Sequence, residues 1–216
     1  MKVALLANGP LGDPAAARAA VAGADLVVAA DGGARHAVAL GMDLDVVVGD
    51  LDSLAPGDVA ALEARGVAVH RHPADKDETD LELALRLALA RGARQAIVVG
   101  GLGARWDQSL ATVLLAADPA FADLDLRLVE GGQEIRVLHG GRSMTLDEAP
   151  GTTVSLLPLA GPAEGVVTEG LHWPLRDEPL RFGSPRGVSN RVVARPARVG
   201  LARGVLAVVV LRGEVA

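Results

Sequence analysis

Two aspartates, Asp50 and Asp52, follow the apolar run Val46–Val48 and are separated by a single leucine. On extended backbone, residues two apart point to the same side, with Cα atoms ~6.5 Å apart. Two carboxylates at this separation can converge on one Mg²⁺, which prefers oxygen ligands and commonly combines carboxylates with phosphate oxygens. The alternative is a turn in which Asp and Ser side chains form local hydrogen bonds. The D-x-D pattern alone leaves both interpretations open.

A second acidic cluster, residues 75–80, directly precedes an Ala- and Leu-rich helical pattern. Thr79, with a glutamate three residues later, is typical of a capping box, and acidic residues in the first turn favour the helix dipole. Capping alone does not require four acids and a lysine within six residues. We therefore expect Asp77 and Asp80 to complete an acidic pocket, with Lys76 available to a phosphate.

Glycine-rich stretches follow two further apolar runs. Asp31, Gly32 and Gly33 form either a turn before a helix or a place where a ligand approaches the backbone closely. Residues 100–108 read GGLGARWDQ and lead into a helical pattern, so their amides can bind phosphate, with Arg105 as a charged donor. Neither the G-K-[ST] of a P-loop nor the G-x-G-x-x-G of a dinucleotide site is present.

Short, continuously apolar runs alternate with helical patterns over the first 132 residues, which is the signature of a parallel sheet covered on both faces. The expected strands are Val3–Ala7, Leu26–Ala30, Val46–Val48, Val67–Val69, Ala96–Val99 and Leu126–Val129. The expected helices include Asp58–Arg65 and Leu81–Arg91. Ligands bind at the carboxyl edge of such a sheet, so the four polar clusters should meet there. Together they indicate Mg²⁺-dependent phosphoryl chemistry.

The pattern changes after residue 132, where short β-like runs are separated by Gly and Pro. We predict a Rossmann-like α/β domain over residues 1–132 and a smaller, sandwich-like all-β domain over residues 133–216. The expected strands of the second domain are Ile135–Leu138, Thr153–Leu157, Gly165–Thr168, Val192–Val193 and Val205–Leu211. Without further context, Trp173 is most simply a core aromatic residue, and Ser189 with Asn190 is most simply a turn.

The composition narrows the function. A net charge of −6, no tyrosine and only two Phe and two Trp argue against nucleic-acid binding. The absence of cysteine excludes disulfides and thiolate sites, and the five histidines lack zinc-site spacing. No apolar run reaches the ~18 residues needed to span a membrane, and the first apolar run is too short for a signal peptide. We therefore expect a cytoplasmic enzyme.

Taken in order, these motifs closely resemble those of the thiamine pyrophosphokinase family. They are DGGA (31–34), GDLDS (49–53), DKDETDLELAL (75–85), GGLGARWDQSLATV (100–113), GLHWPL (170–175) and GVSN (187–190). The resemblance implies transfer of a diphosphate from ATP to the hydroxyl of thiamine, giving thiamine diphosphate and AMP. It also implies a homodimer with active sites between subunits, where the α/β domain of one chain faces the β domain of the other.

The resemblance also implies roles for individual residues. Mg²⁺ on the triphosphate would be held by Asp50, Asp52 and Asp80 or Asp77. The remaining catalytic positions would be Arg105, near phosphate, and Asp107, near thiamine or the metal. Nucleotide- and thiamine-binding positions would be Asp31, Gly32, Gly33, Lys76, Thr79, Gly101, Gly103, Gln108, Trp173, Ser189 and Asn190.

One motif departs from the pattern of many bacterial members, because Gln108 and Thr112 stand where those have His and Asn. This removes a histidine as a possible base and leaves Asp77 and Asp107 as candidates to accept the hydroxyl proton. Three alternatives remain open. They are a diphosphokinase for another primary alcohol such as a pterin, a metal-dependent phosphatase with a nucleophilic Asp, and a non-catalytic regulator that binds nucleotide or thiamine.

Overall fold

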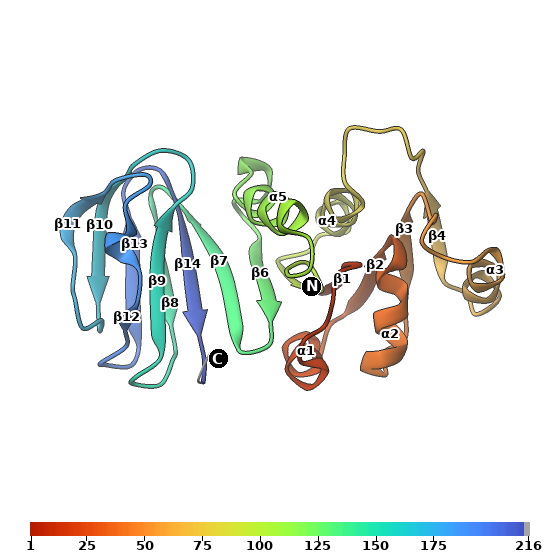
Figure 1. Cartoon of the computed structure of the whole chain (residues 1–216), viewed down its shortest axis with the longest axis horizontal. Coiled ribbons are helices and arrows are strands. Elements are labelled where there is room, and N and C mark those ends of the chain that lie inside the picture. Colours follow the sequence, from red (N-terminus) through yellow and green to blue (C-terminus); the bar gives the residue numbers. More distant parts are fainter. Residues whose placement is uncertain (214–216) are drawn as a thin grey trace. The chain divides into compact units, whose positions relative to one another are not determined.

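The computed structural model describes residues 1–213 and divides into two compact units. Unit 1 comprises Met1–Leu115 and Asp123–Gly131, and unit 2 comprises Ala116–Ala122 and the described residues 132–213. Figure 1 shows helices and strands alternating in the first part of the chain and strands dominating the last part. Among the described residues, no helix has the length and apolar character needed to cross a membrane.

Unit 1 is a parallel sheet in the order β6-β5-β1-β2-β3-β4. Its strands are β1 (Lys2–Leu6), β2 (Leu26–Ala30), β3 (Val46–Gly49), β4 (Ala68–Arg71), β5 (Gln95–Val99) and β6 (Asp125–Glu130). Its helices are α1 (Pro14–Val21), α2 (Ala34–Leu40), α3 (Pro56–Ala64), α4 (Asp80–Ala90) and α5 (Trp106–Ala116), with a short 3₁₀ turn η1 (Asp31–Gly33). The predicted parallel α/β architecture is confirmed, with strand limits shifted by one or two residues.

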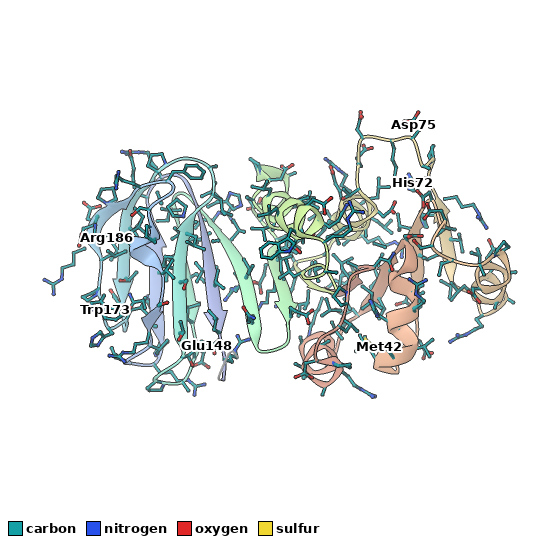
Figure 2. The ribbon with its side chains drawn as sticks, viewed as in Figure 1. Met42, His72, Asp75, Glu148, Trp173 and Arg186 are labelled. Atoms are coloured by element: carbon teal, nitrogen blue, oxygen red, sulfur yellow. The ribbon has the colours of Figure 1, made fainter. Side chains whose placement is uncertain are left out.

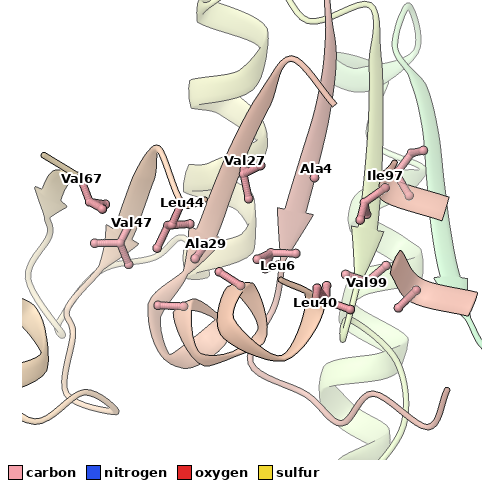
Figure 3. Close-up of a cluster of buried hydrophobic side chains, with 14 of the residues drawn as sticks. Ala4, Leu6, Val27, Ala29, Leu40, Leu44, Val47, Val67, Ile97 and Val99 are labelled. Carbon is pink, nitrogen blue, oxygen red and sulfur yellow. The ribbon is translucent and has the colours of Figure 1, made fainter. Parts of the chain in front are cut away.

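Alternate residues of these strands face opposite sides of the sheet, and Figure 3 shows the core on one side. There, Ala4 and Leu6 of β1 lie with Ala29 of β2 and Leu40 of α2 in one buried cluster. Helix α4 contacts β1, β2 and β3, yet none of its buried residues belongs to this cluster, so α4 covers the other face. Because both faces are covered, the central strands β1, β2, β3 and β5 are almost entirely apolar and buried.

The strand order reverses once. From β1 the chain adds β2, β3 and β4 on one side, and then returns to place β5 against the other side of β1. In an open parallel sheet, the loops that leave the two strands flanking such a reversal diverge and open a crevice at their carboxyl ends. The fold therefore predicts a ligand site beside the ends of β1 and β5.

Unit 2 is an antiparallel sandwich. One sheet has the order β12-β9-β14-β7 and the other β11-β10-β13-β8. The strands are β7 (Gln133–His139), β8 (Arg142–Leu146), β9 (Thr153–Pro158), β10 (Ala163–Glu169), β11 (Arg176–Leu180), β12 (Asn190–Arg191), β13 (Ala197–Leu201) and β14 (Val205–Leu211). Buried residues of both sheets form one cluster, which includes Leu146, Leu156 and Val199. The predicted β-rich second domain is confirmed.

Two details of the predicted strands in unit 2 are wrong. Val192–Val193 is not a strand; the strand there is β12, and Val192 makes only an isolated bridge to Leu171. Strands β8, β11 and β13 were not predicted, because exposed polar side chains interrupt their apolar residues and leave no continuous apolar run. Such half-buried strands show only a short alternating pattern.

Candidate active site

Three aspartates from separate parts of the chain meet at the carboxyl edge of the sheet in unit 1. Asp31 begins η1 directly after β2, Asp50 follows β3, and Asp80 is the first residue of α4. Each offers a carboxylate oxygen, and these oxygens all lie within 4.8 Å of one another. We refer to Asp31, Asp50 and Asp80 as the acidic trio.

Gly49, the last residue of β3, makes room for the acidic trio. A Cβ atom at this position would lie 3.0 Å from Cγ of Asp80 and 3.2 Å from Cβ of Asp31. Its φ of 148° is also one that residues with a side chain rarely adopt. Only glycine therefore allows the two carboxylates to close over the end of β3.

Asp52 does not join this group among the described residues. The prediction that Asp50 and Asp52 share one side of an extended strand is wrong, because β3 ends at Gly49 and Leu51 has a φ of 65°. The backbone N–H of Asp52 donates to Oδ1 of Asp50 at 3.2 Å, and Ser53 Oγ lies 3.3 Å from Oδ1 of Asp52. The motif is thus a local turn that places the Asp50 carboxylate beside those of Asp31 and Asp80 and leaves Asp52 exposed.

The described residues compensate the charge of the acidic trio only in part. Asp31 is 6% exposed, and its Oδ1 has no hydrogen-bond partner among the described residues. Burial raises the pKa of Asp80, and Lys76 offsets part of that rise. The Lys76 ammonium lies 3.0 Å from Asp80 Oδ1 and 3.9 Å from Asp50 Oδ2. Among the described residues, a single ammonium group thus lies against two of the three carboxylates.

A cavity of about 660 Å³ opens beside the acidic trio, at the reversal of strand order. Residues after β1 and β5 line it, among them Asn8, Gly9, Gly100 and Gly101. Predicted site residues that line it are Asp31, Lys76, Thr79, Asp80, Gly101, Gly103, Arg105 and Gln108. The predicted convergence of polar clusters on one sheet edge is therefore observed, and the cavity is large enough for a nucleotide-sized ligand.

The glycine-rich loop on this cavity is held by one hydroxyl. Ser109 Oγ accepts from the N–H of Gly103 at 3.0 Å and lies 3.0 Å from the carbonyl oxygen of Arg105. Gly103 and Ala104 have φ values of 92° and 49°, so the loop turns sharply before α5 begins. Sequence reasoning did not identify Ser109, whose position one turn into the helix is its only local signal.

The loop between β4 and α4 carries the remaining acids of the second cluster. Figure 2 shows His72 and Asp75 on this loop. Asp77 is exposed and lies outside the acidic trio. Thr79 is the N-cap of α4, as predicted, since its Oγ1 accepts from the N–H of Glu82 at 3.2 Å. The Glu82 carboxylate instead pairs with Arg86, so the capping box is one-sided.

In unit 2, Trp173 is 56% exposed, so the interpretation as a core aromatic is wrong (Figure 2). The buried side chain of Asn190 holds the backbone of Trp173 in place. Asn190 Oδ1 accepts from the N–H of Trp173 at 3.1 Å, and Asn190 Nδ2 donates to the carbonyl oxygen of Trp173 at 2.8 Å. The Arg191 guanidinium lies 5.8 Å from the centre of the indole ring. Ser189 has a φ of 62° and its N–H donates to Ser155, as expected of a turn.

Two family models match the chain in these same two regions. Residues 17–128 match the model of the thiamin pyrophosphokinase catalytic domain, and residues 143–206 match that of the thiamin pyrophosphokinase vitamin B1 binding domain. The chain belongs to the thiamin pyrophosphokinase family. The resemblance noted from the sequence motifs is thereby confirmed.

Curated relatives and solved structures agree with membership of this family. The chain is 25% identical over 158 residues to thiamine pyrophosphokinase of Bacillus subtilis (strain 168), covering 73% of this chain and 74% of that protein. It is 26% identical over 164 residues to thiamine pyrophosphokinase 2 of Oryza sativa subsp. japonica, covering 72% and 61%.

The fold matches solved structures along its whole length. The crystal structure of thiamine pyrophosphokinase from Bacillus subtilis aligns with a TM-score of 0.86 and 20% identity, covering 99% of this chain and 100% of that chain. A thiamin pyrophosphokinase family protein from Enterococcus faecalis aligns with a TM-score of 0.83 and 25% identity, covering 99% and 100%.

Two residues expected to act in this family member are paired with each other. Arg105 Nη2 lies 2.5 Å from Asp107 Oδ2, and Nε donates to Oδ1 at 3.1 Å. The hydrogen bond from Arg105 holds the pKa of Asp107 below its usual range, and the same bond raises the pKa of Arg105. Both groups are exposed, so either can exchange its partner for a ligand.

The glycines after β2 pack against the protein itself. A Cβ on Gly33 would lie 2.0 Å from the carbonyl oxygen of Leu6, and one on Gly32 would lie 2.4 Å from Oδ1 of Asn8. Asn8 is a residue that sequence reasoning missed. Its Nδ2 donates to Ser53 Oγ at 3.2 Å and lies 3.5 Å from Oδ2 of Asp31. Its signal is that it directly follows the first expected strand, a position like those of the four recognised clusters.

Proposed function

We propose that this member of the thiamin pyrophosphokinase family transfers the diphosphate of ATP to the hydroxyl of thiamine, giving thiamine diphosphate and AMP. Family models that cover both units support the reaction. The observation that carries the proposal is the acidic trio beside the cavity at the end of β1 and β5. Carboxylates and a glycine-rich loop on one cavity are the parts that phosphoryl transfer requires.

We further propose that the acidic trio holds a divalent cation, and that the chemistry of its ligands favours Mg²⁺. The fit rests on Asp31, whose buried Oδ1 lacks a partner, and on a donor set made only of carboxylate oxygens, which hard cations prefer. A bound Mg²⁺ would neutralise charge on the phosphates. Asp52 stays a predicted ligand, supported by its place on the same turn as Asp50.

In the proposed reaction, the thiamine hydroxyl oxygen forms a bond to the β-phosphorus of ATP. The bond from that phosphorus to the oxygen bridging it to the α-phosphorus breaks, and AMP leaves with this oxygen. The protein contributes mainly by positioning and by stabilising charge. We assign the amides around Gly101 and Gly103, with Arg105 and Lys76, to the phosphate oxygens.

The hydroxyl proton needs an acceptor, and Asp77 and Asp107 remain our candidates. While Asp107 is paired with Arg105, its lowered pKa makes it a weak base. A phosphate that draws Arg105 away would remove this pairing and restore its basicity. Asp77 is exposed on the loop before α4 and needs no such exchange.

We place thiamine on unit 2, against the exposed face of Trp173. The indole offers an aromatic surface to a cationic thiazolium, and Asn190 holds the backbone on which it stands. Ser189 supports the turn beside Asn190. We retain two predictions made from the sequence: a homodimer with active sites between subunits, and a cytoplasmic location.

The reaction is tested by mass spectrometry of the products formed from thiamine, ATP and Mg²⁺. We expect thiamine diphosphate and AMP in equal amounts. Phosphate as the main product would favour the phosphatase alternative, and binding of both ligands without turnover would favour a regulator. A competition assay with thiamine and a hydroxymethylpterin, read by AMP release, tests the remaining alternative.

A further inference from the structure

Lys76 takes an unusual position for a residue expected to bind phosphate. Its side chain is only 12% exposed, and its ammonium lies against Asp80 at 3.0 Å and Asp50 at 3.9 Å. The same ammonium donates a hydrogen bond to the carbonyl oxygen of Pro73 at 2.9 Å, within its own loop. Its contact with Asp80 is an ion pair rather than a well-oriented hydrogen bond.

A divalent cation on the acidic trio would compete with Lys76 for the same carboxylates. Cation–oxygen distances for Mg²⁺ are about 2.1 Å, so a cation bound to the Asp80 oxygen nearest Lys76 would lie within about 5 Å of the ammonium. At that separation in a partly buried site, two positive charges repel strongly. The ammonium and the metal therefore cannot both hold their best positions.

We propose that Lys76 is an internal counter-ion, which stabilises the acidic trio before the metal binds and which the metal releases toward the nucleotide phosphates. The inference rests on the proposed metal site and adds an order to it. Metal binding at the acidic trio frees the positive charge that phosphate needs. Lys76 is thus a positioning residue that pairs first with the acidic trio and then with the nucleotide phosphates.

The sequence provides an internal control for a direct test, since Lys2 is the only other lysine. Lys2 lies on β1, at the opposite end from the cavity, and its ammonium donates to the carbonyl oxygens of Ala20 and Ala22. With lysine labelled at Cε by ¹³C, the NMR spectrum contains two side-chain environments, and Lys76→Met assigns them. We expect Mg²⁺ without nucleotide to shift the Lys76 signal until it saturates, leaving Lys2 unchanged. An unmoved Lys76 signal, under conditions where calorimetry shows saturation by Mg²⁺, would overturn the proposal.

Affinities give a second test in which one substitution acts with opposite signs. In Lys76→Met, the Kd for Mn²⁺ without nucleotide should fall about tenfold, because a competing charge is gone. The Kd for a non-hydrolysable ATP analogue with Mg²⁺ should rise about tenfold, because a phosphate ligand is lost. Unchanged Mn²⁺ affinity, or changes of the same sign, would contradict the proposal. Arg105→Met is the matched control: it removes a positive charge from the same cavity wall but no contact with the acidic trio, and should alter Mn²⁺ affinity within about twofold.

Asp31→Asn separates this inference from the metal site on which it rests. If the acidic trio holds the metal, Asp31→Asn weakens Mn²⁺ binding strongly, whatever Lys76 does. Loss of binding in Asp31→Asn together with no effect of Lys76→Met would reject only the counter-ion role. Wild-type Mn²⁺ affinity in Asp31→Asn would reject the metal site and the counter-ion role together.

Discussion

Two buried carboxylates, Asp31 in unit 1 and Glu134 in unit 2, are treated in opposite ways. Asp31 is 6% exposed and its Oδ1 has no hydrogen-bond partner among the described residues. Glu134 is 5% exposed, but its Oε2 lies 2.8 Å from Arg212 and its Oε1 lies 3.9 Å from Arg136. Both groups are almost fully removed from water, yet among the described residues only Glu134 has guanidinium groups against it.

We interpret the difference as one between a structural charge in unit 2 and a proposed functional charge in unit 1. A buried carboxylate is costly unless paired, and unit 2 meets this requirement within the chain, where Arg212 also bridges to Glu148 at 2.6 Å. Hydrogen bonds to Glu148 and Glu134 raise the pKa of Arg212 further above its usual value. At the acidic trio, we propose that a bound cation meets this requirement. The incompletely compensated burial of Asp31 is the observation on which the proposed site in unit 1 rests.

The largest expected effect comes from a substitution in the acidic trio of unit 1. Asp50→Asn removes one oxygen ligand of the proposed metal and should lower kcat by about 10³-fold, because charge neutralisation dominates phosphoryl transfer. The thermal midpoint should not fall, since the variant also removes an incompletely paired charge. A steady-state assay with unfolding curves checks both. Near-wild-type turnover would remove Asp50 from the metal site.

Asp52→Asn, on the same turn, is the matched variant. A loss comparable to that of Asp50→Asn would show that the exposed carboxylate turns toward the metal when nucleotide is bound. A rate near that of the wild type would exclude Asp52 as a ligand.

A substitution of Glu134 in unit 2 should affect stability instead of metal binding. Glu134→Gln leaves Arg136 and Arg212 facing a neutral amide, and we expect it to lower the free energy of unfolding by about 1–3 kcal/mol. Mg²⁺ affinity should stay unchanged. Chemical denaturation with calorimetric Mg²⁺ titration measures the two quantities. A stable variant with impaired Mg²⁺ binding would reverse the roles given to the two carboxylates.

Trp173→Ala sharpens the comparison within unit 2, where we assign a functional role to an exposed residue. Because the indole is 56% exposed, its removal should change stability little. The KM for thiamine should rise about tenfold through loss of an aromatic surface for the cationic ring, with kcat nearly unchanged. Initial rates at varied thiamine concentration measure this. An unchanged KM would place thiamine elsewhere.

The smallest effect concerns an exposed ion pair. The hydrogen bond from Arg195 holds the pKa of Asp147 below its ordinary value of 3.8. The interaction that lowers this pKa in the folded state contributes stability above pH 3.8. That contribution is lost as the pH falls through the lowered pKa. Asp147→Asn should therefore lower the thermal midpoint slightly at neutral pH and not at strongly acidic pH. A difference that grows on acidification would contradict this sign.

Much of unit 1 could be predicted from the sequence because buried parallel strands are continuously apolar. Those runs located the strands, and the polar clusters at their ends located the cavity edge. The members of the acidic trio could not be chosen this way. Leu51 adopts a φ of 65°, which turns Asp52 away from Asp50, and Asp31 reaches the group only because β2 lies beside β3.

In unit 2 the sequence was less informative for a related reason. Strands such as β8 and β11 expose much of their length, and their few apolar residues do not form a run. The sequence did not reveal the exposure of Trp173 either. Asn190 holds this residue by its backbone, and a tryptophan held in this way cannot be told from a core tryptophan by sequence alone. Apolar runs indicate burial on two faces and do not reveal groups that are positioned by a few specific hydrogen bonds.

The central claim, that a buried carboxylate in unit 1 awaits a cation, is tested most directly by thermal unfolding of the wild type and Asp31→Asn with and without Mg²⁺. We predict that Mg²⁺ raises the thermal midpoint of the wild type. Without metal, Asp31→Asn should be at least as stable as the wild type and should not respond to Mg²⁺. An Asp31→Asn variant that is less stable than the metal-free wild type, or that Mg²⁺ stabilises equally, would contradict the claim.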